Sequence, residues 1–183
     1  MAGVTAGDGD DVGQRATRVL GEHLPALERL IASYARSAAD RADLRQDIAL
    51  AFWSALPRFR GECSEKTFLL RVAHNRALHF LRKRGAATDD IADHEDRVEA
   101  TTGKNPAIRF ERGEQRSRLL DAVRALPVPH RQVMTMMLEG LSQGEIATAL
   151  GTTENNIAVR ANRARAALRV LLEEQSTDER TES

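Results

Sequence analysis

The chain has 183 residues, enough for one domain or two small ones. Its 27 basic and 27 acidic side chains cancel, so the net charge excludes neither a nucleic-acid partner nor a protein partner. Their distribution is more informative. Residues 58–84 carry eight basic and two acidic side chains (net +6). Residues 89–99 carry six acids and one arginine (net −5), and residues 173–182 carry five acids and one arginine (net −4). This alternation predicts that the basic segment contacts a polyanion.

Cys63 is the single cysteine, so the chain can form no internal disulfide and offers no cysteine-based metal site. The five histidines show no ligand spacing, and we expect no metal and no cofactor. No Gly-rich phosphate loop and no Ser/His/Asp set in motif context is present, so we expect neither an enzyme nor a small-molecule substrate. Residues 1–13 are acidic and Gly-rich, which predicts no signal peptide. The longest apolar run, 48–53, is too short to span a bilayer. These features predict a cytoplasmic protein with no membrane insertion.

Taken in order, residues 1–13 are expected to lack structure. Apolar residues spaced by three and four predict a helix over 14–36, and a second helix over 40–56 ends at Pro57. The expected core stripes are Leu20, Leu24, Leu27, Ile31 and Tyr34 in the first helix, and Leu44, Ile48 and Phe52 in the second. A neighbouring face of the second helix mixes acidic, amide and apolar side chains: Asp43, Gln46, Asp47, Leu50 and Trp53. The spacing leaves open whether Trp53 serves a partner or covers the edge of the core.

A third helix is predicted over 65–84, with Ser64 as its cap. Leu70, Ala73, Ala77 and Leu81 would face inward, and Arg71, Asn75 and Arg82 would face elsewhere. Basic and amide groups with Phe68 among them suit single-stranded nucleic acid, because they neutralise the backbone while a ring stacks on an unpaired base. The alternative is a solvated basic helix with Phe68 and Phe80 in the core, which we favour for Phe80.

Residues 85–106 are acidic and without period, which is typical of a linker. Fully extended, they would reach roughly 70 Å, enough to hold two small domains on separate segments of one duplex. Helices are predicted over 107–126 and 130–139, with breaks at Pro127 and Pro129. Their expected core residues are Leu119, Leu120, Val123, Leu126, Val133, Met134, Met137 and Leu138. The acidic tail, 175–183, is expected to fray.

Residues 141–172 have the pattern of a helix-turn-helix. Ser142 and Glu145 form a capping box, Gly151 suits a left-handed helix end, and Thr152 or Thr153 can cap the next helix. That helix has an apolar stripe: Ile157, Ala161, Ala164 and Leu168. Another side carries Asn156, Arg160 and Arg163, which is what a major groove would meet. Two amphipathic helices joined by a glycine turn also occur in helical bundles, where such arginines are merely solvated.

The predicted fold class is all-α, with two small helical domains joined by a flexible acidic linker. The predicted divisions are a disordered start (1–13), a first domain (14–84), the linker (85–106), a second domain with the helix-turn-helix (107–174) and the tail (175–183).

The order of these segments resembles a bacterial RNA polymerase sigma factor of the extracytoplasmic-function (ECF) type, which consists of regions 2 and 4. DLRQDIALAFWSAL (43–56) is similar to the region 2 segment that grips the polymerase clamp helices. The segment 59–84 is similar to the part that melts and reads the −10 promoter element. The segment 126–169 is similar to region 4, which reads the −35 element.

The resemblance implies three sets of site residues and no metal ligands. Those for core polymerase are Asp43, Leu44, Gln46, Asp47 and Trp53. Those for −10 DNA are Phe59, Arg60, Cys63, Ser64, Lys66, Phe68, Arg71, Asn75 and Arg76. Those for −35 DNA are Ser142, Thr153, Asn156, Arg160 and Arg163. The implied partners are core RNA polymerase (β′ clamp helices and β flap), promoter DNA and an anti-sigma factor, which could recruit the protein to a membrane. DNA melting would be driven by binding energy, with no nucleotide hydrolysis.

The chain departs from the family pattern at a few positions. The family usually has tryptophan and another aromatic residue where Phe68 and Leu70 stand, an apolar residue in place of Arg45, and lysine in place of Ala158. Val159 replaces a small polar residue, so the −35 preference does not transfer directly. Two rival hypotheses are a DNA-binding regulator that never engages polymerase, which has no use for the 43–53 face, and a helical adaptor that binds only proteins.

Overall fold

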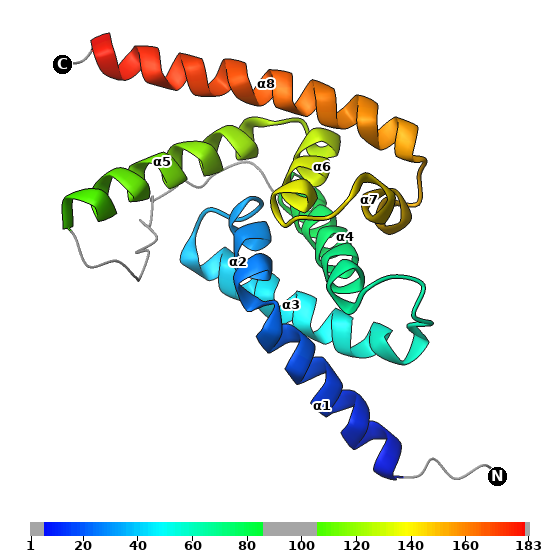
Figure 1. Ribbon diagram of the computed structural model, residues 1–183. Helices are drawn as coiled ribbons and strands as arrows, with labels where there is room; N and C mark the ends of the chain where they lie inside the picture. Colours follow the sequence, from blue (N-terminus) through cyan, green and yellow to red (C-terminus); the bar gives the residue numbers. More distant parts are fainter. Residues whose placement is uncertain (1–5, 86–105, 182–183) are drawn as a thin grey trace.

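The computed structural model describes the backbone of residues 6–85 and 106–181, and side chains within 11–84 and 113–174. Within these ranges the protein contains only helices and turns, which confirms the all-α class (Figure 1). The N-terminal helices are α1 (Ala6–Glu22), α2 (Leu24–Ala32), α3 (Ala38–Ala55), the short 3-10 helix η1 (Leu56–Arg58) and α4 (Glu65–Gly85). The C-terminal helices are α5 (Pro106–Ala125), α6 (Val128–Leu138), α7 (Gln143–Leu150) and α8 (Glu154–Thr181). The expected linker lies almost wholly outside the described residues.

The prediction of one helix over 14–36 was wrong, because the chain breaks at His23 and α2 begins with Leu24 and Pro25. Proline has no backbone N–H and cannot continue a preceding helix. The break also changes the stripe: Leu24 is 44% exposed, while Val19 and Leu30 are in the core. Residues 6–13, expected to lack structure, belong to α1, and residues 1–5 lie outside the described part.

The helices α3 and α4 follow the prediction closely. Ser37 caps α3, because its Oγ accepts from the Asp40 backbone N–H at 3.1 Å, and the α3 stripe of Leu44, Ile48 and Phe52 is buried. Ser64 caps α4 in the same way, accepting from the Thr67 N–H at 3.1 Å. These caps fix the residue at which each helix starts. The start in turn decides which side chains of α3 and α4 face the core and which face outward.

The helix-turn-helix consists of α7 and the first half of α8. The predicted capping box of Ser142 and Glu145 is present, and Gly151 is left-handed with φ 63°. Thr153 caps α8 by accepting from the Asn156 N–H at 3.3 Å. A Cβ at Gly144 would lie 2.9 Å from Glu154 Oε1, so a larger residue there would only displace the end of the flexible Glu154 side chain.

Two boundaries in the C-terminal half differ from the prediction. Helix α6 begins at Val128, so Pro129 lies in its first turn, where a missing N–H costs nothing, rather than ahead of it. Helix α8 continues to Thr181, through residues expected to fray. No glycine or proline interrupts the sequence 154–181, so nothing in it ends the helix earlier.

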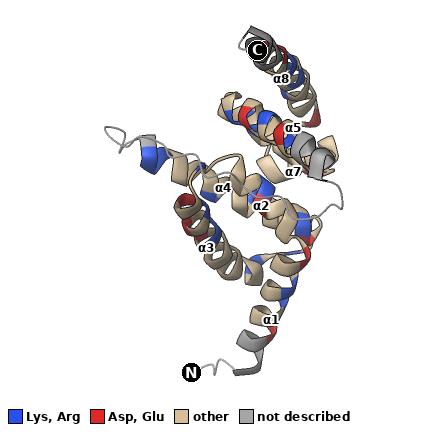
Figure 2. Ribbon diagram, turned by 90° about the vertical axis from the view of Figure 1, so that its left-hand side faces the viewer, with Lys and Arg blue, Asp and Glu red and all other residues tan. Residues whose placement is uncertain are grey.

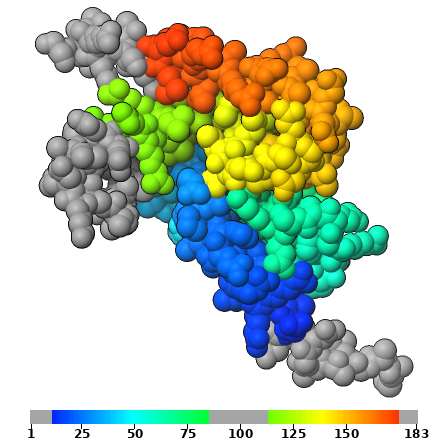
Figure 3. Space-filling model, in the orientation of Figure 1, coloured from blue at the N-terminus to red at the C-terminus, as the bar shows by residue number. Residues whose placement is uncertain are grey.

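The two halves of the chain pack against each other. One apolar cluster combines residues of α1–α4 with Val133, Met136, Ile146 and other residues of α6, α7 and α8. Figures 1 and 3 show α4 running beneath α6 and α7, with α8 on the outer side of the C-terminal half. A smaller cluster joins α5, α6 and α8 around Leu126.

Cations of each half cap the carbonyl ends of helices in the other half. Three hydrogen bonds follow this pattern: Arg124 Nε to the Ala32 carbonyl (2.9 Å), Arg131 Nη1 to the Ser33 carbonyl (3.4 Å) and Lys66 Nζ to the Glu139 carbonyl. The carbonyl end of a helix is the negative end of its dipole, so these positions favour a cation. Arg29 also forms a bidentate ion pair with the Glu139 carboxylate at 2.7 Å.

Candidate nucleic-acid interface

The outer face of α3 carries acidic, amide and apolar side chains, as predicted. Asp43, Gln46 and Asp47 are exposed, and Leu50 and Trp53 are 57% and 50% exposed. Half of the Trp53 side chain therefore remains accessible to solvent. Figure 2 shows the charges of this helix, which runs along the outside of the N-terminal half.

Leu44 does not belong to that face. Its side chain is 1% exposed and packs in the core beside Ile48 and Phe52, so it offers nothing to a partner in this arrangement. The helical period explains why Leu44 was wrongly assigned to the exposed face, because a residue on the core stripe cannot also point outward. Arg45, unusual for its position, forms an ion pair with Glu28 of α2. This contact lets a charged residue occupy a site where an apolar one is expected.

The loop before α4 is built on two stacked rings. Phe59 lies against Phe68 with ring centroids 4.6 Å apart, and the Arg71 guanidinium lies 4.9 Å from the centre of the Phe68 ring. Phe68 is only 4% exposed, so its ring is occupied by the core and by Arg71. It cannot stack on a base without rearrangement, and Phe59, which is half-buried, is the more accessible ring.

A hollow of about 140 Å³ opens beside these rings. Its lining is Arg58, Phe59, Arg60, Glu62, Cys63 and Arg71. Four of these residues belong to the predicted −10 set, so the structure brings them together at one depression. Burial raises the pKa of the Cys63 thiol, although Arg71 opposes this effect. Cys63 is therefore a poor nucleophile and suits a wall of the hollow better than a redox centre.

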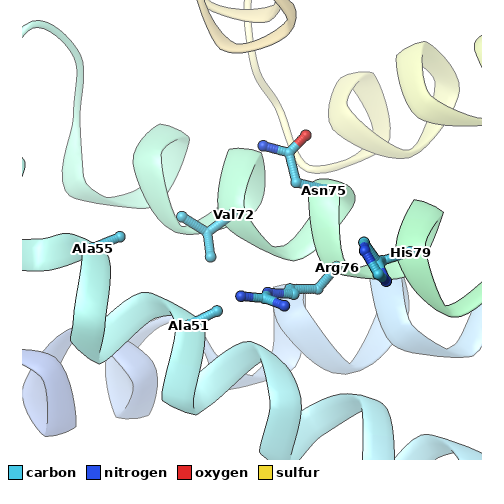
Figure 4. Close-up of a pocket in the computed structure, with 6 residues that line it drawn as sticks. All are labelled: Ala51, Ala55, Val72, Asn75, Arg76 and His79. Atoms are coloured by element: carbon cyan, nitrogen blue, oxygen red, sulfur yellow. The ribbon is translucent and has the colours of Figure 1, made fainter.

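Asn75 and Arg76 lie apart from that hollow, on a second depression between α3 and α4 (Figure 4). This groove of about 440 Å³ has an apolar floor and a polar rim, formed by Ala51, Ala55, Val72, Asn75, Arg76 and His79. Arg76 Nη1 lies 3.9 Å from Asp47 Oδ1, so the groove borders the outer face of α3.

Ser64 and Lys66 are engaged within the protein. Ser64 is the cap of α4, and Lys66 donates to the Glu139 carbonyl at the end of α6. Beside them, Thr67 Oγ1 donates to Glu145 Oε1 of α7 at 3.4 Å. The first turn of α4 is thus covered by the helix-turn-helix, so part of the predicted −10 set faces the other domain.

The predicted −35 set is divided between the start of α7, which Ser142 caps, and the first part of α8. Ser142 and Thr153 are exposed at their side chains but act as helix caps. Asn156 and Arg163 are exposed, whereas Arg160 is half-buried. Asn156 and Arg163 of α8 are therefore accessible without rearrangement, whereas Ser142 lies beside Glu145, which contacts Thr67 of α4.

His74 is not among the residues that the sequence predicted to face inward on α4. The ring is fully buried between the domains: Nδ1 lies 3.1 Å from the Tyr34 hydroxyl, and Nε2 lies 3.2 Å from Thr135 Oγ1 of α6. Burial lowers its pKa to about 3, so the ring is neutral at physiological pH. The spacing held a signal, because Leu70, His74, Ala77 and Leu81 follow i, i+4, i+7, i+11 on the inward side.

Within the described residues, no three His, Cys, Asp or Glu side chains come close enough to hold a metal ion. None of the helices in those ranges combines the length and the apolar character that a bilayer crossing requires.

Models of two sigma-70 regions match the chain: region 2 over residues 19–87 and region 4 over residues 116–168. The ECF RNA polymerase sigma factor SigM of Mycobacterium tuberculosis is 30% identical over 152 residues, which cover 82% of this chain and 73% of SigM. The chain belongs to the ECF sigma factors. The RNA polymerase sigma-H factor of Pseudomonas aeruginosa is 29% identical over 148 residues, 76% of each chain.

Two solved structures share the fold of this ECF sigma factor. CnrH, solved in complex with the cytosolic domain of CnrY, has a TM-score of 0.62 at 24% identity and covers 88% of this chain and 90% of its own. The sigma factor RpoE of Bartonella quintana, solved in complex with the anti-sigma factor NepR, has a TM-score of 0.66 at 24% identity, with coverages of 89% and 97%. The region 2 match runs from the end of α1 through α4, and the region 4 match runs from the second half of α5 to the first half of α8.

Proposed function

We propose that this ECF sigma factor binds core RNA polymerase through the outer face of α3. The exposure of that face carries the proposal: two carboxylates, an amide, Leu50 and Trp53 lie together on one helix. A large aromatic residue that stays half exposed among charged groups is typical of an interface anchor. In the family the corresponding segment grips the β′ clamp helices, and region 4 meets the β flap.

The two DNA-facing sets would act at the two promoter elements. Helix α8 would enter the −35 major groove, and the loop before α4 would hold an unpaired base of the −10 strand in the hollow beside Phe59. Asn75 and Arg76 would lie at the edge of the melted segment. Binding energy alone would drive melting, and no nucleotide would be hydrolysed by this chain.

Promoter binding would require the two domains to separate. In this structure the start of α4 is hydrogen-bonded to the start of α7. The two promoter elements are separated by about 25 base pairs, which at ~3.4 Å per base pair is roughly 85 Å along the duplex. The packed arrangement would then be a resting form. An anti-sigma factor that binds this form would keep the protein inactive, either in the cytoplasm or at a membrane.

Run-off transcription with core polymerase tests the proposal. The wild-type protein should give promoter-specific transcripts above those of core alone. Asp47→Arg should reduce the transcript and the capture of core enzyme by at least tenfold, because it places a cation at the centre of the α3 face. Glu174→Arg, the same charge change on the distant part of α8, should leave both unchanged. No promoter-specific start with the wild-type protein, or full activity of Asp47→Arg, would contradict the proposal.

A further inference from the structure

The side of α8 that points furthest from the core is not the side of Asn156, Arg160 and Arg163 that the sequence predicted to meet the major groove. The fully buried residues of this part of α8 define the inward direction: Ile157, Ala161 and Ala164. At about 100° per residue, Val159 projects roughly 170° away from that direction, with Asn155 about one turn before it and Asn162 about one turn after it along the helix. All three are exposed, and Val159 is 42% exposed. A valine therefore occupies the centre of the outward face.

The arginines lie at the edges of this face. Arg160 projects only about 70° from the inward direction, which agrees with its half-buried side chain, and Arg163 projects about 130° from it. Long cationic side chains at the margins of a recognition helix reach phosphates, whereas the central residues meet the edges of the bases. Figure 3 shows the first half of α8 at the surface, with no other segment over it in that view.

An exposed valine at the centre of the outward face can make an apolar contact with only one kind of group in a major groove. Donor and acceptor atoms line the base edges, and the C5 methyl of thymine is the apolar group among them. We infer that Val159 contacts a thymine methyl group in the −35 element and so makes thymine preferred at one position. This inference rests on the proposed function, because it requires α8 to bind the −35 major groove.

The test replaces thymine by uracil, which removes only that methyl group. The full-length protein with core polymerase is first used to select −35 sequences from a randomised promoter library. Each selected thymine, on either strand, is then changed to uracil, and promoter affinity is measured by competition. The variant is Val159→Ala. The control is Val170→Ala, because Val170 is also exposed (52%) on α8 but lies about 16 Å further along the helix, one turn before Glu173 and Glu174.

One thymine should be sensitive in the wild-type protein, with an affinity loss of about fourfold, as expected for one buried methyl group. Val159→Ala should lose the sensitivity at that position and no other, and Val170→Ala should retain it. The inference is overturned if the wild type is indifferent to uracil at every selected position, or if Val159→Ala keeps the same sensitive thymine. In both cases a selected −35 sequence leaves the proposed function standing. If no −35 sequence is selected at all, the proposed function fails, and this inference with it.

Discussion

Helices α4 and α8 carry the two candidate DNA-contacting sets, and they differ in what covers them. The first turn of α4 is hydrogen-bonded to region 4 through Lys66 and Thr67, and Phe68 is buried beside them. The first half of α8 lies at the surface with its polar side chains exposed. In the packed form, therefore, region 4 covers the first turn of α4, whereas the hollow beside Phe59 and the first half of α8 are open. Domain separation would uncover the part of the predicted −10 set on the first turn of α4 and would not change access to the −35 duplex.

The largest expected effect tests whether the two domains form one cooperative unit. Phe52→Ala removes a fully buried ring from the region 2 core and should lower the free energy of unfolding by about 3–5 kcal/mol. Because one apolar cluster spans both domains, region 4 should lose stability with region 2. Urea unfolding would be followed by fluorescence of Trp53, the single tryptophan, and by far-ultraviolet circular dichroism, which reports all helices. Two separate transitions in the wild type would show that the domains are independent.

A smaller effect should come from the buried contact at His74. Thr135→Val leaves His74 Nε2 without its hydrogen-bond partner in the packed form and should weaken domain packing by about 1–3 kcal/mol. The radius of gyration measured by small-angle scattering should rise, and α4 amides should exchange faster with solvent. Thr148→Val serves as the control, because Thr148 is exposed on α7. An unchanged radius of gyration in Thr135→Val would contradict a role for this contact.

Acidification should loosen the same contact. The buried ring has a pKa of about 3, whereas a histidine exposed by domain separation titrates near its ordinary value of about 6.5. Stability of the packed form is therefore fully present above pH 6.5 and is lost progressively as the pH falls below it. Between pH 7.5 and 5.5 the opening equilibrium should rise about tenfold, or ~1.4 kcal/mol. Hydrogen exchange of α4 at both pH values checks this, and His74→Gln should remove most of the dependence.

The smallest effect should come from the cap of α7. Ser142→Ala removes the cap of α7 and should cost about 1 kcal/mol, because the Glu145 backbone N–H loses its acceptor. The loss should appear in the thermal unfolding of the protein while leaving −10 strand binding by the opened form unchanged. Ser54→Ala is a matched control, since Ser54 is exposed near the end of α3 and caps no helix start. Equal effects of the two substitutions would contradict the capping role.

Local signals in the sequence sufficed for most of the fold. Capping residues, glycines and apolar spacing predicted the starts of α3, α4, α7 and α8 to within about two residues. The failures have local causes as well. The break at Pro25 was overlooked because the apolar spacing continues across it, and Leu24 was assigned to the core for the same reason.

The candidate site could be predicted only in part. Exposure of the α3 face followed from the helical period. The engagement of Lys66 with Glu139 and the contact of His74 with Thr135 join residues more than 60 positions apart, which no local pattern encodes. The sequence did not single out Val159 as the centre of the outward face of α8, because it carries no charge, whereas arginines are the usual DNA ligands.

The cations that cap helix ends across the domain contact have a consequence for ionic strength. Contacts of Arg124, Arg131 and Lys66 with helix carbonyl ends are electrostatic and weaken as salt is added. Contacts of arginines with DNA phosphates weaken with salt as well. Added electrolyte would therefore weaken the contact between the domains and, at the same time, the proposed contacts with DNA, so its two effects on promoter binding would oppose each other. Promoter affinity should vary less steeply with salt than the number of phosphate contacts alone would dictate.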